Sequence, residues 1–198
     1  KRAEAQIERL AFYDPLTGLC NRRLFLERLA QALANGSRNH EWGAVCFIDL
    51  DNFKDLNDTQ GHDQGDLLLQ QVSRRLQEAV REQDTVGRLG GDEFVVLLES
   101  MGPDGDRAAL YANTVGENLL RALTVPYQLL SGPQHNTASI GITLFRDHED
   151  RVEDILKRAD LAMYQAKAVG RNTVRFFDPH MQEVVVRRAE LERDLRGA

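Results

Sequence analysis

Residues 85–98 read TVGRLGGDEFVVLL, and this stretch decides what kind of sheet the chain can form. The apolar segments at its two ends are short and rich in β-branched residues, which is typical of strands. Gly90 and Gly91 separate these segments, and a two-residue glycine turn joins antiparallel strands because both of its positions tolerate a positive φ. The stretch therefore predicts a β-hairpin with Asp92 and Glu93 beside its turn.

A second apolar segment, 43–50 (GAVCFIDL), predicts a central strand that ends at the acidic residues Asp49 and Asp51. If the hairpin lies beside this strand, its turn brings Asp92 and Glu93 close to Asp49. Carboxylates packed together raise one another's pKa, and a hard divalent cation with oxygen ligands removes that cost. Magnesium also bridges nucleotide phosphates, so these acids predict phosphoryl or nucleotidyl transfer. The alternative is that Asp92 and Glu93 are solvated turn residues.

Hydrophobic periodicity and turn residues indicate the other elements of the domain. We expect helices at 1–12, 21–34, 106–122 and 152–169, and strands at 43–50, 85–89, 93–98, 125–130, 136–145 and 172–177. This mixed order predicts an α+β domain in which a largely antiparallel central sheet is flanked by helices. A split βαβ arrangement of the ferredoxin-like type is the arrangement we expect.

Four helix boundaries are predicted from single residues. Asn21 is expected to cap the helix that follows it, and Gly36 to end that helix. Residues 51–65 are predicted to be loop or irregular helix, with Asp66 capping or opening a long helix. Gly170 is expected just past the end of the last long helix of the domain.

Composition excludes several classes of protein. The chain has 198 residues, enough for one domain, and its formal net charge is −6, so it has no general basic field for nucleic acid or an anionic membrane. Its two cysteines, Cys20 and Cys46, indicate reduced thiols rather than a disulfide framework. No run of about 18 apolar residues predicts a membrane span. We expect a cytoplasmic domain without membrane contact of its own. This expectation is compatible with a parent protein that is anchored in a membrane.

Five motifs carry a resemblance to a known family. They are DPLTGLCNRR (14–23), FIDLDNFKDLNDTQGHDQGD (47–66), GRLGGDEF (87–94), ASIGIT (138–143) and ADLAMYQAKAVGRN (159–172). In this order and spacing they resemble the GGDEF family of diguanylate cyclases. The resemblance implies the ferredoxin-like palm of nucleotidyl cyclases, and the condensation of two GTP into cyclic di-GMP with release of two pyrophosphates. It also implies Mg²⁺, with Mn²⁺ as an alternative, and a homodimer in which each domain holds one GTP.

The resemblance implies a metal site and a catalytic pair. Asp49, the backbone carbonyl of Leu50, Asp92 and Glu93 are the expected metal ligands. Asp92 and Glu93 are the expected catalytic residues, and Asp92 is the usual candidate for the base that takes the proton of the ribose 3′-hydroxyl. Which of the two acts as the base and which mainly holds metal is left open, because a carboxylate that ligates metal is a poor base.

The resemblance also assigns substrate contacts. Asn57 and Asp66 are the expected guanine-binding residues, which agrees with the ability of an acidic side chain to accept from guanine N1–H and the 2-amino group. The alternatives are a turn residue for Asn57 and a helix cap for Asp66. We expect Gly61 and Gly65, in contrast, to form turns rather than to bind ligand.

The phosphates of GTP are expected to meet two sets of groups. The backbone amides of Phe53 and Lys54 are predicted to bind the β- and γ-phosphates, and Lys167 and Arg171 match the family's phosphate-contacting pair. The alternative for this pair is solvated cations at a helix C-terminus. Gly91 is expected to let the backbone approach the nucleotide closely.

A second binding site is indicated by Arg81-Glu82-Gln83-Asp84, an RxxD sequence that the five residues 85–89 separate from Gly90. In the family this spacing marks a product-inhibition site, so Arg81 and Asp84 are expected to bind cyclic di-GMP. An Arg suits phosphate and the guanine N7/O6 edge. The alternative is an exposed i,i+3 ion pair at a helix end.

The ends of the chain resemble connectors to other domains. Residues 1–12 resemble a coupling helix after a sensor domain, 13–178 the GGDEF domain, and 179–198 a connector towards a downstream EAL-like domain. The chain is therefore expected to be a middle module of a tandem protein. This leaves an alternative function, a GTP-binding regulatory module that controls an attached cyclic di-GMP phosphodiesterase.

Overall fold

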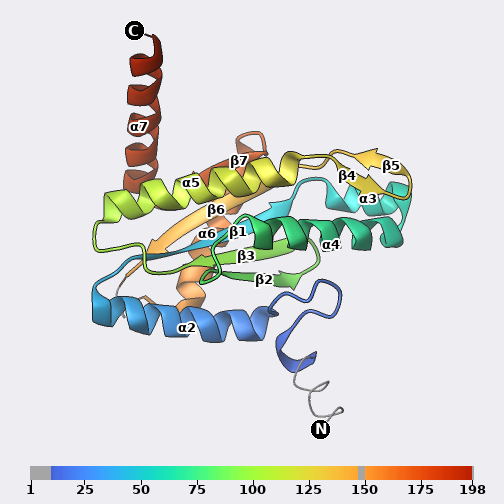
Figure 1. Cartoon of the computed structure of the whole chain (residues 1–198), viewed down its shortest axis with the longest axis horizontal. Coiled ribbons are helices and arrows are strands. Elements are labelled where there is room, and N and C mark those ends of the chain that lie inside the picture. Colours follow the sequence, from blue (N-terminus) through green and yellow to red (C-terminus); the bar gives the residue numbers. More distant parts are fainter. Residues whose placement is uncertain (1–9, 147–149, 198) are drawn as a thin grey trace.

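A five-stranded sheet in the order β2-β3-β1-β6-β7 forms the centre of the computed structural model, which describes residues 10–146 and 150–197 (Figure 1). The strands are β1 (Gly43–Leu50), β2 (Thr85–Gly90), β3 (Glu93–Leu98), β6 (Ala138–Phe145) and β7 (Thr173–Phe176). β1 pairs antiparallel with β3 and β6, and only the β6–β7 pair is parallel. The predicted α+β fold with a largely antiparallel sheet and a split βαβ core is confirmed, with β7 added at one edge.

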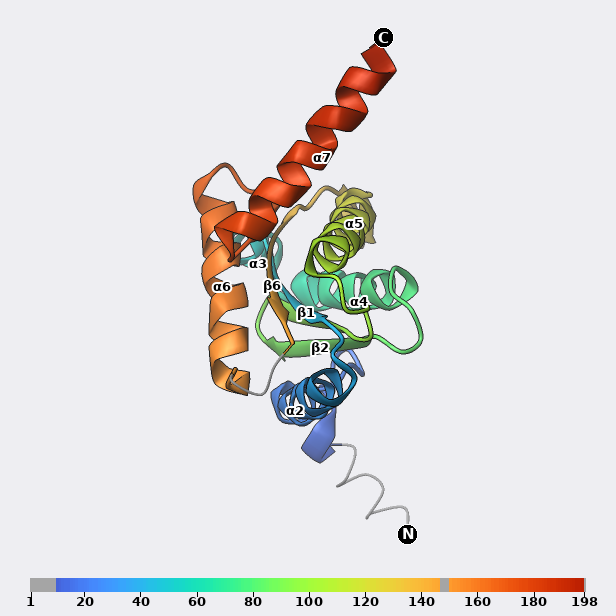
Figure 2. The ribbon, with the colours of Figure 1, turned by 90° about the vertical axis from the view of Figure 1, so that its left-hand side faces the viewer.

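Helices cover both faces of the sheet (Figure 2). α4 (His62–Glu78) and α5 (Gly105–Thr124) pack on one face, and α2 (Arg22–Asn39) and α6 (Val152–Ala168) on the other. The short α3 (Phe53–Gln60) precedes α4, and α7 (Pro179–Gly197) extends away from the domain. A separate two-stranded hairpin consists of β4 (Tyr127–Leu129) and β5 (Gly132–Gln134).

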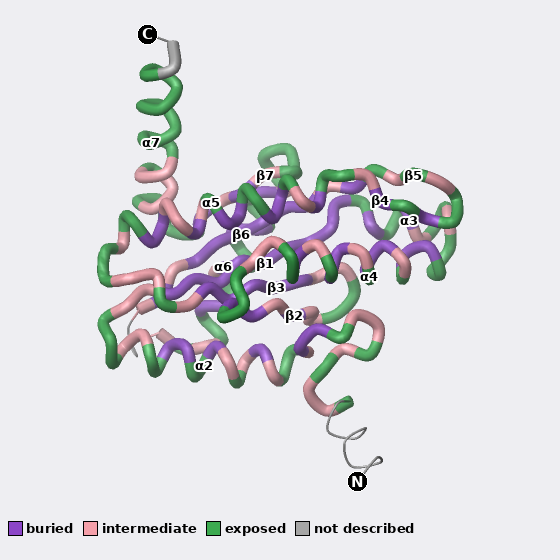
Figure 3. Tube along the Cα trace, viewed as in Figure 1, coloured by how far each residue is buried: buried purple, intermediate pink, exposed green. Residues whose placement is uncertain are grey.

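Side-chain alternation along β1 divides the core in two. Ala44, Cys46 and Ile48 belong to the cluster under α4 and α5, whereas Val45 and Phe47 belong to the cluster under α2 and α6. All eight residues of β1 are buried, which agrees with a sequence that is apolar at every position except Asp49 (Figure 3). The side chain that follows Phe47 on the same face is Asp49, so β1 presents its last carboxylate on the α2/α6 face.

The predicted start of α2 is confirmed, but its predicted end is wrong. Asn21 caps the helix as predicted, because its side-chain oxygen accepts from the Leu24 amide at 3.1 Å. The predicted end at Gly36 is wrong, since α2 continues to Asn39. The helix ends instead at His40, which adopts a left-handed conformation (φ 56°) and donates its N–H to the Gly36 carbonyl. A glycine inside a helix costs only about 1 kcal/mol, too little to stop it there.

The segment expected to be loop or irregular helix contains two regular helices. α3 ends at Gln60, and Gly61 (φ 90°) turns the chain into α4, which begins at His62. Gly61 is thus the turn residue that we predicted. The predictions for Gly65 and Asp66 are wrong, because both lie inside α4 and neither forms a turn or a cap.

Two smaller differences and one confirmed prediction concern strands and turns. The hairpin turn consists of Gly91 and Asp92, one residue later than predicted, because Gly90 pairs with Glu93 after an irregularity in β2. The strand β5 was not expected, and β4 pairs with it outside the main sheet. Gly170 follows α6 with φ 125°, as predicted.

The terminal predictions are only partly described. The residues at 1–9 lie outside the described part of the chain, and the remaining residues of the expected coupling helix, 10–12, are helical. Residues 179–197 form α7, and their role as a connector stays a prediction. No helix of the described residues has both the length and the apolar character that crossing a bilayer requires.

Candidate active site

The site is built on a cross-strand pair of acids. Asp49 on β1 lies directly opposite Glu93 on β3, so both carboxylates start from the α2/α6 face of the sheet. The hairpin thus lies beside the central strand as predicted. Leu50 secures this arrangement, because its amide donates to the carbonyl oxygen of Asp92 at 3.3 Å. The end of β1 and the hairpin turn are therefore held together at backbone level.

The local environment opposes the ionisation of these acids. The pKa of Asp49 is raised to about 6, chiefly by burial and also by the charges of Asp92 and Glu93, although Lys167 acts in the opposite direction. Burial also raises the pKa of Glu93, and the neighbouring Asp160 and Asp92 act in the same direction. A cation bound beside these carboxylates would therefore stabilise their ionised forms.

Lys167 supplies one such cation. Its Nζ lies 2.6 Å from Oδ1 of Asp49, and the two side chains are 31% and 10% exposed. This ion pair is the contact that brings positive charge to Oδ1 of Asp49. Lys167 reaches Asp49 because α6 packs closely on β6 at Gly141, where a Cβ atom would lie 2.1 Å from the Ala159 carbonyl oxygen.

The donor set fits a divalent cation. Two facing carboxylates and the backbone of Leu50 offer oxygen ligands, which Mg²⁺ prefers. Among the described residues, no three acidic, histidine or cysteine side chains gather into a complete metal cage. Magnesium is typically held by one or two carboxylates together with substrate phosphates and water, so an incomplete protein cage agrees with this metal.

Asp51 does not belong to the acidic cluster. Its buried carboxylate accepts from Thr137 Oγ1 at 2.6 Å, from Ser139 Oγ at 2.8 Å and from the Asn172 amide at 3.2 Å. These bonds connect the end of β1 to the start of β6 and to the loop after α6. Asp51 thereby holds the loop that carries Arg171, whose side chain is exposed and whose φ is 62°.

The phosphate-binding candidates lie at the start of α3. Asn52 has a left-handed conformation (φ 57°) and makes no side-chain cap, so Phe53 and Lys54 begin the helix directly. The first amides of a helix have no hydrogen-bond partner within that helix, so they are free to donate to a bound anion such as a phosphate. The Phe53 side chain is buried and the Lys54 side chain is exposed, so only their backbone amides share one location.

The guanine-binding candidates lie on either side of the junction of α3 and α4. Oδ1 of Asn57 is buried and lacks a hydrogen-bond partner among the described residues. A Cβ atom at Gly65 would lie 1.9 Å from this oxygen, so the glycine makes room for the Asn57 side chain. Asp66, the next residue, is exposed. Unpaired polar groups of this kind favour a ligand that satisfies them.

The RxxD residues have different surroundings. Asp84 is 9% exposed, and its Oδ2 accepts from the Arg81 amide at 3.0 Å. The guanidinium of Arg81 lies 4.5 Å from the centre of the Tyr111 ring on α5. The expected alternative, an exposed ion pair between the two side chains, does not describe this geometry, because Asp84 is buried and bonds to backbone.

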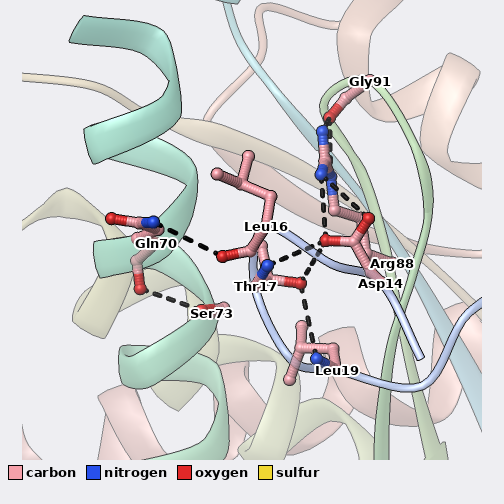
Figure 4. Close-up of polar contacts among 8 residues, drawn as sticks. All are labelled: Asp14, Leu16, Thr17, Leu19, Gln70, Ser73, Arg88 and Gly91. Carbon is pink, nitrogen blue, oxygen red and sulfur yellow. Dashed lines mark hydrogen bonds and ion pairs between the residues drawn. The ribbon is translucent and has the colours of Figure 1, made fainter. Parts of the chain in front are cut away.

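A side-chain brace that the sequence does not predict lies behind the hairpin turn. Arg88 donates from Nε and Nη2 to the carbonyl oxygen of Gly91, at 3.0 and 2.8 Å, and from Nη1 to Asp14 (Figure 4). Asp14 also accepts from the amide and hydroxyl of Thr17, at 2.9 and 2.6 Å. Both residues lie in quoted motifs, but nothing local in the sequence pairs residues 74 positions apart.

The fold and the site together define a domain with the palm fold of nucleotide cyclases. The family model described as "Diguanylate cyclase, GGDEF domain" matches residues 11–173, and the chain belongs to this family. The chain is 42% identical over 197 residues to the bifunctional diguanylate cyclase/cyclic di-GMP phosphodiesterase MucR of Pseudomonas aeruginosa, covering all of this chain but 28% of that protein.

Solved structures show the same relationship. The GGDEF domain of TpbB (YfiN) from Pseudomonas aeruginosa is 37% identical with a TM-score of 0.78, over 87% of this chain and 98% of that one. The coiled coil and GGDEF domain of DgcB from Caulobacter crescentus, solved in complex with c-di-GMP, is 26% identical with a TM-score of 0.78, over 88% and 90% of the two chains.

Proposed function

We propose that this domain is a diguanylate cyclase that condenses two GTP into cyclic di-GMP. In this reaction each ribose 3′-hydroxyl loses its proton and attacks the α-phosphate of the other GTP. Two phosphodiester bonds form, and two pyrophosphates leave. The observation that carries the proposal is the facing pair of Asp49 and Glu93, with Lys167 beside Asp49. Family membership and relatives named as diguanylate cyclases support it.

Four groups would hold magnesium in this proposal: the carboxylates of Asp49, Asp92 and Glu93 and the carbonyl of Leu50. Bound Mg²⁺ would neutralise phosphate charge as it develops. The chain's own contribution is to hold these groups at fixed positions, through the β1–β3 pairing and through the bond between Leu50 and Asp92. Asp92 or Glu93 would receive the 3′-hydroxyl proton.

The remaining residues of the site would bind GTP. Asn57 and Asp66 would bind the guanine, and the amides of Phe53 and Lys54 would bind phosphate together with Lys167 and Arg171. Gly91 would allow close approach at the hairpin turn. One domain holds one GTP, so catalysis would need two chains that face each other. A cytoplasmic location agrees with the use of GTP.

Product inhibition would act through the RxxD site. In this proposal Arg81 binds the phosphate or the guanine of cyclic di-GMP, and the stacked Tyr111 ring keeps its guanidinium in place. Asp84 would contribute through the turn that it stabilises at the Arg81 amide. Replacement of Arg81 by Ala should therefore relieve inhibition by added cyclic di-GMP and leave the fold intact.

The test is product formation by the purified chain. Incubation with GTP and Mg²⁺, followed by chromatographic separation, should yield cyclic di-GMP and pyrophosphate. The double variant Asp92→Ala/Glu93→Ala should bind GTP and form no product. If the unmodified chain also binds GTP without product at every protein concentration, the cyclase proposal fails and the GTP-binding regulatory module takes its place.

A further inference from the structure

A single residue joins the two helices that carry the proposed guanine contacts. Gly61 lies between α3 and α4 with φ 90° and ψ 159°, and α4 has no side-chain cap at its start. Asn57 lies one turn before this junction, and Asp66 lies a little more than one turn after it. Because backbone rotation at Gly61 is permissive, the junction alone does not fix the distance between the two side chains.

The β4–β5 hairpin contacts both sides of this junction (Figure 1). Gln60, the last residue of α3, donates to Oε1 of Gln134 at 3.0 Å and accepts from the hydroxyl of Ser131 at 2.7 Å. Gln64, in the first turn of α4, accepts from the Leu130 amide at 3.0 Å. One short hairpin thus bonds to the end of one helix and to the beginning of the next.

Further bonds dock the hairpin along α4. Gln71 exchanges two hydrogen bonds with the backbone of Gln128, at 2.8 and 3.2 Å. Arg75 donates to carbonyls of the segment just before β4, including that of Pro126 at 2.7 Å, and its guanidinium lies 3.8 Å from the Tyr127 ring centre. Gln64, Gln71 and Arg75 are spaced by seven and four residues, so they lie on one face of the helix.

Three consecutive residues of α4 connect this docking to the guanine contacts. Gln64 is only 9% exposed and bonds to the hairpin. Gly65 is the residue whose missing side chain accommodates Oδ1 of Asn57. Asp66 is exposed beside them. A shift of Gln64 therefore moves the support of one proposed guanine contact and the backbone of the other.

We propose that the β4–β5 hairpin clamps the α3–α4 junction and so sets the selectivity of the domain for guanine. Gln60 and Gln64 are positioning residues in this account, because they act through Asn57 and Asp66 and do not touch the base. The inference rests on the proposed function only in taking these two residues as the guanine contacts.

The experiment uses two nucleotides that differ at one group. ITP lacks the 2-amino group of GTP, so the ratio of their affinities measures the contact that a carboxylate makes to that group. Calorimetric titration of GTP and ITP into the Asp92→Ala/Glu93→Ala chain gives this ratio without turnover. In the active chain, KM and kcat are measured for both nucleotides.

Gln60→Ala/Gln64→Ala should weaken GTP binding by about five- to tenfold, the effect of roughly one lost hydrogen bond, and bring the GTP/ITP ratio towards one. The kcat for GTP should stay within about twofold, since the carboxylates at the sheet edge are untouched. Ser131→Ala/Gln134→Ala removes only the two bonds to Gln60 and leaves the bond from the Leu130 amide to Gln64, so it should shift the ratio in the same direction but by less, without altering either helix.

Gln70→Ala is the matched control. Gln70 lies on another face of α4 and donates to the Leu16 carbonyl at 3.4 Å (Figure 4), so its loss should leave the ratio unchanged. An unchanged GTP/ITP ratio in both hairpin-contact variants would overturn the clamp. So would an equal drop in all three variants, which would indicate general destabilisation. Absence of product in the unmodified chain would instead contradict only the cyclase proposal, because the binding ratio remains measurable.

Discussion

Nη1 of Arg88 donates to both carboxylate oxygens of Asp14, at 3.0 and 3.2 Å, across 74 residues of sequence. The two side chains are only 11% and 18% exposed, so water weakens the pair less than it would at the surface. The same guanidinium holds the Gly91 carbonyl. The segment that leads into α2 and the turn that carries Asp92 are therefore joined through one side chain.

Replacement of Arg88 by Ala is expected to lower kcat about tenfold, because the turn beside Asp92 and Glu93 loses the donors that hold it. Stability should fall by roughly 1–3 kcal/mol, since charge-assisted bonds are lost. Steady-state kinetics and urea unfolding measure the two effects. Arg28→Ala is the control, because Arg28 also reaches β2, at Thr85 Oγ1 (3.1 Å), but not the turn. Equal kcat losses in both variants would contradict a specific role of Arg88.

The Asp14–Arg88 pair also predicts a pH dependence of stability. Burial alone would raise the pKa of Asp14, but the bonds from Thr17 and Arg88 outweigh it and hold this pKa below its ordinary value of 3.8. The stabilisation is therefore fully present above about pH 4 and is lost as the pH falls through the lowered pKa. Asp14→Asn should be less stable at pH 7 and should lose less stability on acidification. Urea unfolding midpoints of both proteins between pH 2.5 and 7, a range that includes the ordinary pKa of 3.8, measure this difference in pH dependence. Parallel curves for the two proteins would contradict the prediction.

The Lys167–Asp49 ion pair predicts a substrate-binding defect. Lys167→Ala should raise the KM for GTP by about 10- to 100-fold, because the charge-assisted phosphate contact proposed for this residue would be lost. Lys167→Arg should recover part of this, since the charge remains and the geometry changes. Arg158→Ala is the control on the same helix, because Arg158 pairs with Asp150 instead. A normal KM in Lys167→Ala would remove this residue from the site.

The close approach of Asn57 to Gly65 predicts an effect of one added methyl group. Gly65→Ala would place a carbon 1.9 Å from Asn57 Oδ1, so the Asn57 side chain must move and GTP binding should weaken by roughly 1–3 kcal/mol. In an Asn57→Ala background the same change should cost much less, because the clash is gone. Titration calorimetry of the four proteins measures this coupling; additive losses would show that Gly65 acts independently of Asn57.

The architecture was largely predictable, because the hairpin and the continuous apolar strand are strong local signals. α3 was harder to predict, since eight residues give little periodicity and the helix starts after a left-handed Asn52. β5 has three residues and contains Pro133, which argues against a strand. The offset of the hairpin turn comes from the irregularity between Arg88 and Gly90, for which the sequence shows no signal.

The site was predictable only where neighbouring strands bring motifs together. The adjacency of Asp49 and Glu93 follows from the pairing of the hairpin with β1, and the structure shows it. The bracing roles of Asp51 and Arg88 depend on partners 86, 88 and 74 residues away, so no local pattern reports them. The clamp on the α3–α4 junction depends on glutamines, whose types alone indicate only polar surface.

The measurement that tests the central claim most directly is the rate of cyclic di-GMP formation from GTP and Mg²⁺ as a function of protein concentration. In the proposed mechanism two facing domains supply one GTP each, so the rate per chain should rise in proportion to concentration while chains are mostly monomeric. Asp49→Asn should abolish product at every concentration. A rate per chain that is independent of concentration for chains shown to be monomeric, or product formation by Asp49→Asn, would contradict this account.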